Sequence, residues 1–151
     1  MQILERATLI PGRSPAEVFE FCLDGANFSA IFPEPVFAAG NTRHASLRIE
    51  AGREFDFWQL MFGFVPVRWR MRILEVLPDQ CFTDAMQSGP MRSFVHRHSV
   101  AAADTGTTYT DQITYEAPGG EIFGRKIVRP YLERLFQARQ RNMLALLARE
   151  H

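Results

Sequence analysis

From Val36 to Pro118 the sequence alternates between apolar and polar residues, and this period of two constrains the fold more than any other feature. The segment VRWRMRILEVLP shows it most plainly, because Trp69, Met71 and Ile73 fall on one face of an extended chain. The other alternating runs are SLRIEAG, REFDFWQLMFGF with a bend at its glycine, QCFTDAMQ, MRSFVHRHSVAA and TTYTDQITYEAP. About six short strands with hairpin-like spacing predict an antiparallel sheet.

The residues before this segment predict one strand and two short helices. Residues 3–9 are short and mixed, which favours a first strand. Residues 15–23 predict a helix, since Ser14 stands at the N-cap position and Glu17 completes a capping box. The segment NFSAIFP predicts a second short helix, which the prolines that follow bring to an end.

The last thirty or so residues change to helical spacing over several turns. The apolar positions with this spacing are 128, 132, 135, 136, 143, 146 and 147. Pro130 either kinks this helix or starts its main segment, because proline has no N–H to donate. Gly119 and Gly120 predict a flexible entry to it.

The predicted fold class is therefore α+β. It consists of a curved antiparallel sheet of about six to seven strands around a long C-terminal helix, with two short helices after the first strand. We expect one domain that spans residues 1–151. A sheet curved around a helix leaves room between them, and such room is where ligands bind.

Composition narrows the classes of partner. Lys+Arg and Asp+Glu both number 17, so the net charge gives no reason to expect nucleic acid or an anionic membrane. The 13 Phe residues need a large core or an apolar cavity. Cys22 and Cys81 form no CxxC motif and read as small core residues. We expect a cytoplasmic protein without membrane insertion, because the sequence shows neither a signal peptide nor a membrane-spanning run; its oligomeric state stays open.

One face of the sheet collects polar residues among apolar ones. His96 and His98 share a face, and pairing around the turn that follows places them beside Asp111 and Tyr115. Asp84 shares the inward face of the preceding strand. We expect the cavity to be lined by Trp69, Met71, Asp84, Phe94, His96, His98, Asp111, Tyr115, Leu135 and Arg139.

Three interpretations of this polar cluster are open. In the one that we adopt, the histidines and aspartates satisfy one another and line or buttress the cavity, with Arg139 as counter-charge to one aspartate. A second is acid–base work on a bound ligand by a His–Asp pair. A third is a metal site with two histidines and a carboxylate. No third-ligand motif is clear, so we expect neither a metal nor a cofactor.

The order of elements, together with three segments of the second half, resembles the START-like (SRPBCC) superfamily. The segments are FTDAMQSGPMRSFVHRHSV, GTTYTDQITYEAPGG and LFQARQRNML. The pattern is closest to that of bacterial ligand-binding members of unassigned role, although Phe94 stands where tryptophan is more usual and Val100 where phenylalanine is. The resemblance implies a helix-grip fold, and the superfamily includes polyketide cyclases/dehydrases as well as lipid and hydrophobic-ligand carriers.

The first functional hypothesis is the binding, with transport as an extension, of a small hydrophobic ligand between the sheet and the C-terminal helix. The alternative is an enzyme like a polyketide cyclase/dehydratase that uses His, Asp and Tyr in the same cavity. The second alternative is a protein-interaction module, which would show a closed interior and a large exposed apolar patch. Whether the protein is an enzyme stays open, and no residue is assigned as catalytic.

Overall fold

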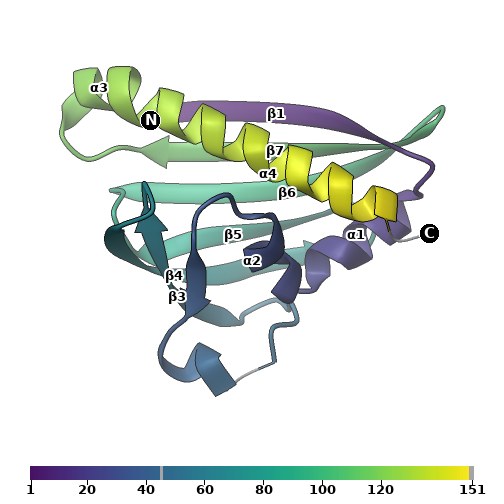
Figure 1. Cartoon of the computed structure of the whole chain (residues 1–151), viewed down its shortest axis with the longest axis horizontal. Helices are drawn as coiled ribbons and strands as arrows, with labels where there is room; N and C mark the ends of the chain where they lie inside the picture. The colour runs from purple at the N-terminus through teal and green to yellow at the C-terminus, as the bar shows by residue number, and fades with distance from the viewer. Residues whose placement is uncertain (45, 150–151) are drawn as a thin grey trace.

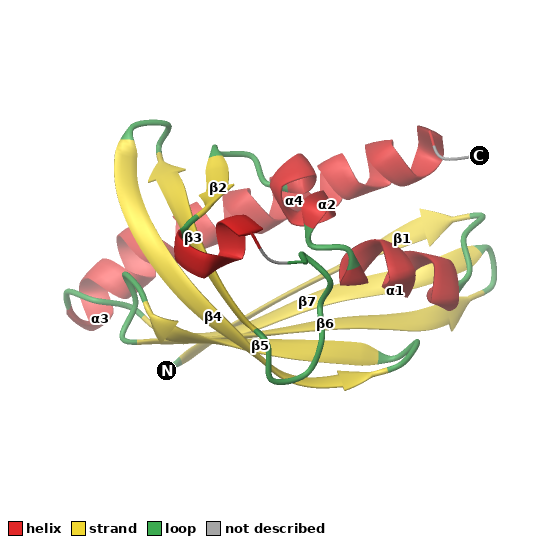
Figure 2. Ribbon diagram, turned by 90° about the horizontal axis from the view of Figure 1, so that it is seen from below, coloured by secondary structure: helices red, strands yellow, loops and turns green. Residues whose placement is uncertain are grey.

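The computed structural model describes residues 1–44 and 46–149 and has the predicted α+β helix-grip architecture. Seven antiparallel strands form one sheet in the order β1-β7-β6-β5-β4-β3-β2. The strands are β1 (Gln2–Pro11), β2 (Val36–Ala38), β3 (Glu54–Met61), β4 (Val65–Leu77), β5 (Cys81–Ser88), β6 (Ser93–Ala103) and β7 (Gly106–Glu116). The sheet curves around the helices, which all lie on its concave side (Figures 1 and 2).

The two short helices that follow β1 are α1 (Pro15–Leu23) and α2 (Ala26–Ile31). The capping box is present, because Ser14 Oγ accepts a hydrogen bond from the Glu17 amide at 3.2 Å and Glu17 Oε1 accepts one from the Ser14 amide at 3.2 Å. A 3-10 turn, η1 (Gly40–His44), follows β2.

The C-terminal helical segment has three parts, namely α3 (Gly120–Phe123), a π-helical turn η2 (Gly124–Val128) and α4 (Arg129–Arg149). Pro130 is the second residue of α4 and directly follows the π-helical turn, so the proline, which has no N–H to donate, coincides with the change of helix type. Gly119 and Gly120 have φ angles of +81° and +89°, which glycine adopts readily. This entry lets α4 cross the concave face of the sheet (Figure 1).

The register of the sheet confirms the predicted sharing of faces. His98 pairs with Asp111, and Phe94 pairs with Tyr115. On β4, alternate residues are buried at Trp69, Met71 and Ile73, and exposed at the intervening arginines. The inward face of the sheet therefore presents apolar residues together with the histidines and aspartates that the sequence analysis singled out.

One predicted strand is wrong and one strand was missed. The run SLRIEAG forms no strand beyond a single bridge between Asp24 and Arg48. Its backbone instead bonds to the end of α1, where the Leu47 carbonyl accepts from Gly25 and the Ile49 amide donates to Leu23. Tertiary contacts thus satisfy hydrogen-bonding groups that a strand would have paired with a neighbour. The missed strand is the short edge strand β2, which completes the sheet. Its three residues are too few to show a periodicity.

The core consists of two apolar groups. The first surrounds α1 and the end of α4 and includes Phe82, while the second surrounds the start of α4 and includes Phe136. His98 stacks on Phe82 with ring centroids 4.0 Å apart, and His96 packs edge-on against Phe136 at 5.0 Å. The two histidines therefore lie at the junction of the two groups. No helix in the described ranges has both the length and the apolar character to cross a membrane.

Candidate ligand-binding site

A cavity of about 250 Å³ lies between the sheet and the helices α2 and α4. Most of the side chains around it are apolar, and many are aromatic. Because a cavity of roughly 150 Å³ holds benzene, this one has room for about ten non-hydrogen atoms. The wall extends to Ser29 and Phe37, which are exposed, so the cavity reaches the surface.

Eight of the ten residues expected to line the cavity do so, and two do not. Those in the wall are Trp69, Met71, Asp84, Phe94, His96, His98, Leu135 and Arg139. Asp111 and Tyr115, both on β7, lie outside it and are almost completely buried. Helix α4 packs over this side of the sheet, where Gln140 donates to the Arg6 carbonyl of β1 and to Asp111. The helix therefore covers Asp111 and Tyr115 on β7, and the cavity opens mainly over β2 to β6.

Several lining residues were missed by sequence reasoning. Phe28 and Phe32 come from α2 and the residue after it, and their spacing of four in NFSAIFP was the available signal. Gln59 is buried and accepts a hydrogen bond from Trp69 Nε1 at 2.8 Å, while its amide nitrogen donates to Tyr131 at 2.9 Å. A lone glutamine in a strand carries no sequence signal for such a role.

Asp111 is the acceptor at the centre of a buried network. His96 Nε2 lies 2.6 Å from Asp111 Oδ1, and the Tyr109 hydroxyl donates to the same oxygen at 2.7 Å. Gln140 Nε2 donates to Oδ2 at 3.0 Å. Burial opposes the charge of Asp111, but the charge of His96, its hydrogen bond and the charge of Arg139 outweigh burial and hold the carboxyl pKa well below its usual value. This carboxylate orients His96 from behind the cavity wall.

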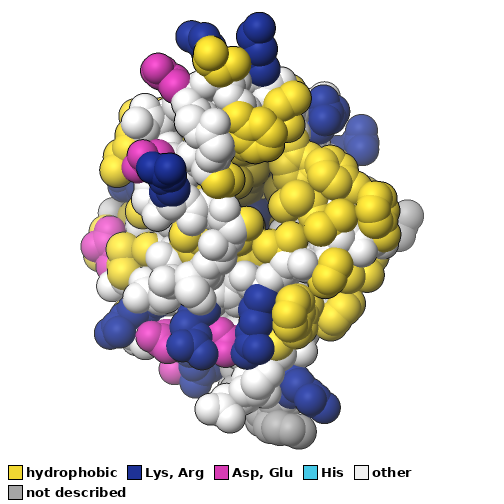
Figure 3. Space-filling model, turned by 90° about the vertical axis from the view of Figure 1, so that its left-hand side faces the viewer, with side chains coloured by type: hydrophobic (Ala, Val, Ile, Leu, Met, Phe, Trp, Pro, Cys, Tyr) yellow, Lys and Arg dark blue, Asp and Glu magenta, His cyan; other side chains and the backbone are white. Residues whose placement is uncertain are grey.

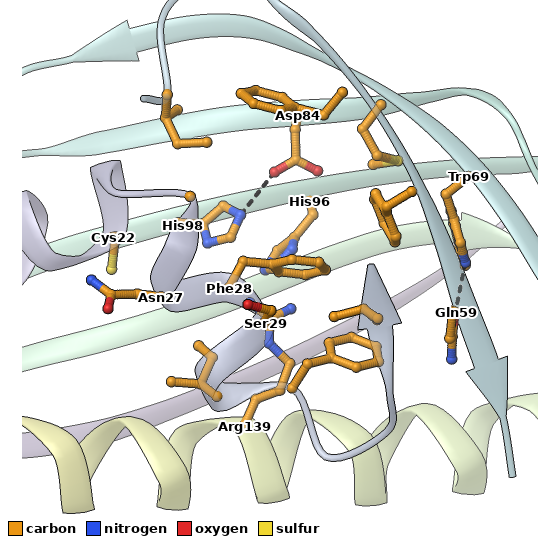
Figure 4. A pocket seen from close by; sticks show the side chains of 18 of the residues that line it. Cys22, Asn27, Phe28, Ser29, Gln59, Trp69, Asp84, His96, His98 and Arg139 are labelled. Atoms are coloured by element: carbon orange, nitrogen blue, oxygen red, sulfur yellow. Dashed lines mark hydrogen bonds and ion pairs between the residues drawn. The ribbon is translucent and has the colours of Figure 1, made fainter. Parts of the chain in front are cut away.

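His98 forms a second pair with Asp84 inside the cavity. His98 Nε2 lies 2.9 Å from Asp84 Oδ2 (Figure 4), and Nδ1 lies 3.1 Å from the Tyr109 hydroxyl oxygen. Burial and the charge of His96 lower the pKa of His98 to about 4, although the bond to Asp84 partly opposes this. Burial raises the pKa of Asp84, but the hydrogen bond from His98 and the surrounding positive charge produce a net lowering. At neutral pH a neutral imidazole therefore donates to an ionised carboxylate.

Asp84, His96 and His98 also form the one candidate metal-ligand set among the described residues, with one ligand atom from each within 4.8 Å of the others. The two imidazoles stack, with ring centroids 3.7 Å apart and 30° between their planes. Imidazoles that bind one ion direct a nitrogen at a common centre instead. An ion would also have to replace the hydrogen bond between His98 and Asp84. This geometry fits a hydrogen-bonded network better than a metal centre.

The charge of Arg139 lowers the pKa of both Asp84 and Asp111, but no ion pair joins Arg139 to either aspartate among the contacts of the described chain. Its guanidinium lies over three phenylalanine rings, with the guanidinium carbon 5.0 Å from the centre of Phe136, 5.6 Å from that of Phe28 and 5.9 Å from that of Phe32. Both aspartates already have other hydrogen-bonding partners. The guanidinium therefore acts on them only through its charge.

The surface at the α3 end of the molecule is markedly apolar. Figure 3 shows hydrophobic side chains gathered on this face around a hollow. Exposed large hydrophobic residues at this end include Phe62 and Phe64 in the β3–β4 turn and Ile122 and Phe123 in α3. Phe62 packs against Tyr131 of α4, with ring centroids 5.1 Å apart, so the turn and the helix are in contact.

Solved structures of other proteins share this fold. The chain is similar to protein TTHA0849 from Thermus thermophilus at 16% identity and TM-score 0.76, with 97% of each chain covered. It is similar to CV1439 from Chromobacterium violaceum at 11% identity and TM-score 0.74, covering 97% of this chain and 98% of that one. It is also similar to Ara h 8.0201 at 11% identity and TM-score 0.72, with 97% of each covered. The last is Bet v 1-like, a START/SRPBCC-type fold, and at these identities the likeness concerns the fold alone.

The chain belongs to the family described as Domain of unknown function (DUF8410), whose model matches residues 36–147. No curated protein matches the sequence. The matched residues run from β2 into α4 and include both histidines and both aspartates of the buried cluster.

Proposed function

We propose that this chain is a START-like binding domain that holds a small, largely apolar molecule between the sheet and α4. The observation that carries the proposal is the cavity of about 250 Å³, which has a mostly apolar wall with a few polar groups. Burial of apolar ligand surface would supply affinity at about 25 cal/mol per Å² before the entropic costs of binding. Transport would require release to an acceptor in addition. The cytoplasmic location rests on the sequence alone.

The test is uptake of naphthalene, a neutral apolar probe whose size matches the room for about ten non-hydrogen atoms, measured by isothermal titration calorimetry. Ala38 lines the cavity from β2, so Ala38→Trp should fill part of the space and reduce probe binding at least tenfold. Ala101 is exposed on β6, and Ala101→Trp is the matched control that should leave binding unchanged. If the wild type takes up no probe, or if both variants bind it like the wild type, the cavity is not a binding site.

An enzyme is the second candidate, and the orientation of His96 favours it. His96 Nε2 is held by Asp111, while Nδ1 has no hydrogen-bond partner in the described part of the chain and His96 lines the cavity. A base oriented from behind by a carboxylate, with its other nitrogen toward a ligand, is the arrangement used for proton removal. This role would assist a cyclisation or dehydration in the cavity.

The enzymatic role is tested by separating binding from turnover. His96→Gln should abolish conversion of a poly-β-ketone substrate while leaving the affinity for naphthalene within about twofold. Equal turnover by the wild type and the variant would rule out His96 as the base. The protein-interaction alternative requires a closed interior, and the cavity speaks against it despite the apolar surface at the α3 end.

A further inference from the structure

Arg139 on α4 is the charged residue of the cavity wall whose hydrogen-bonding capacity is unused. Its residue exposure is 6%, and no hydrogen bond or ion pair joins its guanidinium to another group of residues 1–44 and 46–149. Nε is fully buried and without a partner. The remaining guanidinium nitrogens have no partner either and face the cavity (Figure 4).

A buried guanidinium in this state needs a partner. Removing a charge from water is costly unless it is paired and hydrogen-bonded. The three surrounding phenylalanine rings attract the positive charge, but they satisfy few of the five N–H donors of arginine. The two nearby carboxylates are engaged elsewhere, since Asp84 is bound by His98 and Asp111 by His96, Tyr109 and Gln140. No acceptor within residues 1–44 and 46–149 is therefore free for this guanidinium, and a bound molecule could supply one.

We propose that Arg139 binds the carboxylate of an amphipathic monocarboxylic acid whose apolar part fills the cavity. This inference rests on the proposed binding function and names the chemical class of the ligand. The planar fork of arginine matches the two oxygens of a carboxylate. Arg139 is the sole Lys or Arg among the lining residues of the described chain, and Asp84 shares the wall, so a doubly charged phosphate would meet too little positive charge and a repelling carboxylate.

The size of the cavity restricts the acid. Room for about ten non-hydrogen atoms corresponds to an eight-carbon fatty acid or to a benzene ring joined through two carbons to the carboxylate, as in cinnamate. The aromatic residues beside Arg139, Phe28 and Phe136 among them, would contact the first carbons after the carboxylate. The acid enters with its apolar part against the β3 to β5 side of the wall, where Met71 and Trp69 lie.

The experiment compares acids with their uncharged amides by isothermal titration calorimetry. The pairs are octanoate with octanamide and cinnamate with cinnamamide, which differ little in shape but differ in charge. The wild type should bind the acid of at least one pair about ten- to a hundredfold more tightly than its amide, as expected for hydrogen bonds to a charged group. Arg139→Met should remove this preference and leave the affinity for the amide within about threefold.

Two further variants make the test specific. Arg139→Lys keeps the charge but loses the planar fork, so its preference for the acid should be intermediate. Arg141→Met changes an exposed arginine of the same helix and should behave like the wild type. Arg139→Met is expected to fold, because an apolar side chain among three phenylalanine rings removes a buried charge.

The outcomes separate this inference from the proposed function. If neither acid binds more tightly than its amide, or if Arg139→Met weakens acid and amide alike, the carboxylate role of Arg139 is overturned while cavity binding of naphthalene still stands. If neither the acids, the amides nor that probe binds, the proposed function fails first.

Discussion

As the pH falls, the protonation of His98 should destabilise the protein at a higher pH than the protonation of the buried aspartates does. The pKa of His98 is about 4 in the folded state and near its ordinary value of 6.5 in the unfolded chain. Between these values the unfolded state binds the extra proton, so stability is complete above about pH 6.5 and falls as the pH decreases. At ~1.4 kcal/mol per pKa unit, the loss approaches about 3 kcal/mol near pH 4.

The surroundings of His98 explain this magnitude. Its side chain is 10% exposed and lies between Phe82 and His96. Asp84 and Asp111 partly compensate a positive charge there, and without them the pKa would fall further. The pKa values of both aspartates are lowered, so their own loss of stability begins only below about pH 4 to 5.

The assay is urea unfolding followed by far-UV circular dichroism at several values between about pH 7 and about pH 4.5. The free energy of unfolding of the wild type should decrease by about 2–3 kcal/mol over this interval. In His98→Gln the free energy of unfolding should decrease less over the same pH interval, by about that amount, whatever the stability of the variant at neutral pH. A wild-type stability that stays constant from pH 6.5 to 4.5, or an unchanged slope in the variant, would refute the assignment of a neutral buried imidazole.

Three other predictions concern stability and the cavity. Asp111→Asn should lower the free energy of unfolding by about 3 kcal/mol, because it disrupts a buried charged network, whereas Asp104→Asn in an exposed turn should have little effect in the same urea titration. Gly106→Ala should destabilise by about 2 kcal/mol or more in thermal unfolding, since its Cβ would lie 2.1 Å from a backbone oxygen of β1. Ligand binding should alter tryptophan fluorescence in Trp58→Phe but not in Trp69→Phe, because Trp69 lines the cavity.

Local patterns were sufficient for most of the secondary structure. The capping box at Ser14 defines the start of α1, and alternation along β4 shows which face is buried, because each depends only on neighbours in the chain. The pairing of His98 with Asp111 also follows from parity and a short turn. The prediction of a strand at SLRIEAG was wrong because the groups that form hydrogen bonds with its backbone belong to the end of α1.

By itself, the sequence determined the helix-grip order of elements and the set of polar residues on the inward face, since periods of two and 3.6 specify faces without tertiary information. Only the tertiary structure decided which of those residues meet the cavity. Helix α4 packs over β7 and encloses Asp111 and Tyr115, whereas His96, His98 and Asp84 remain in the open part. Only the structure showed that Arg139 has no hydrogen-bond partner among the described residues, because the position of its guanidinium depends on packing between distant segments and no spacing along the chain encodes it.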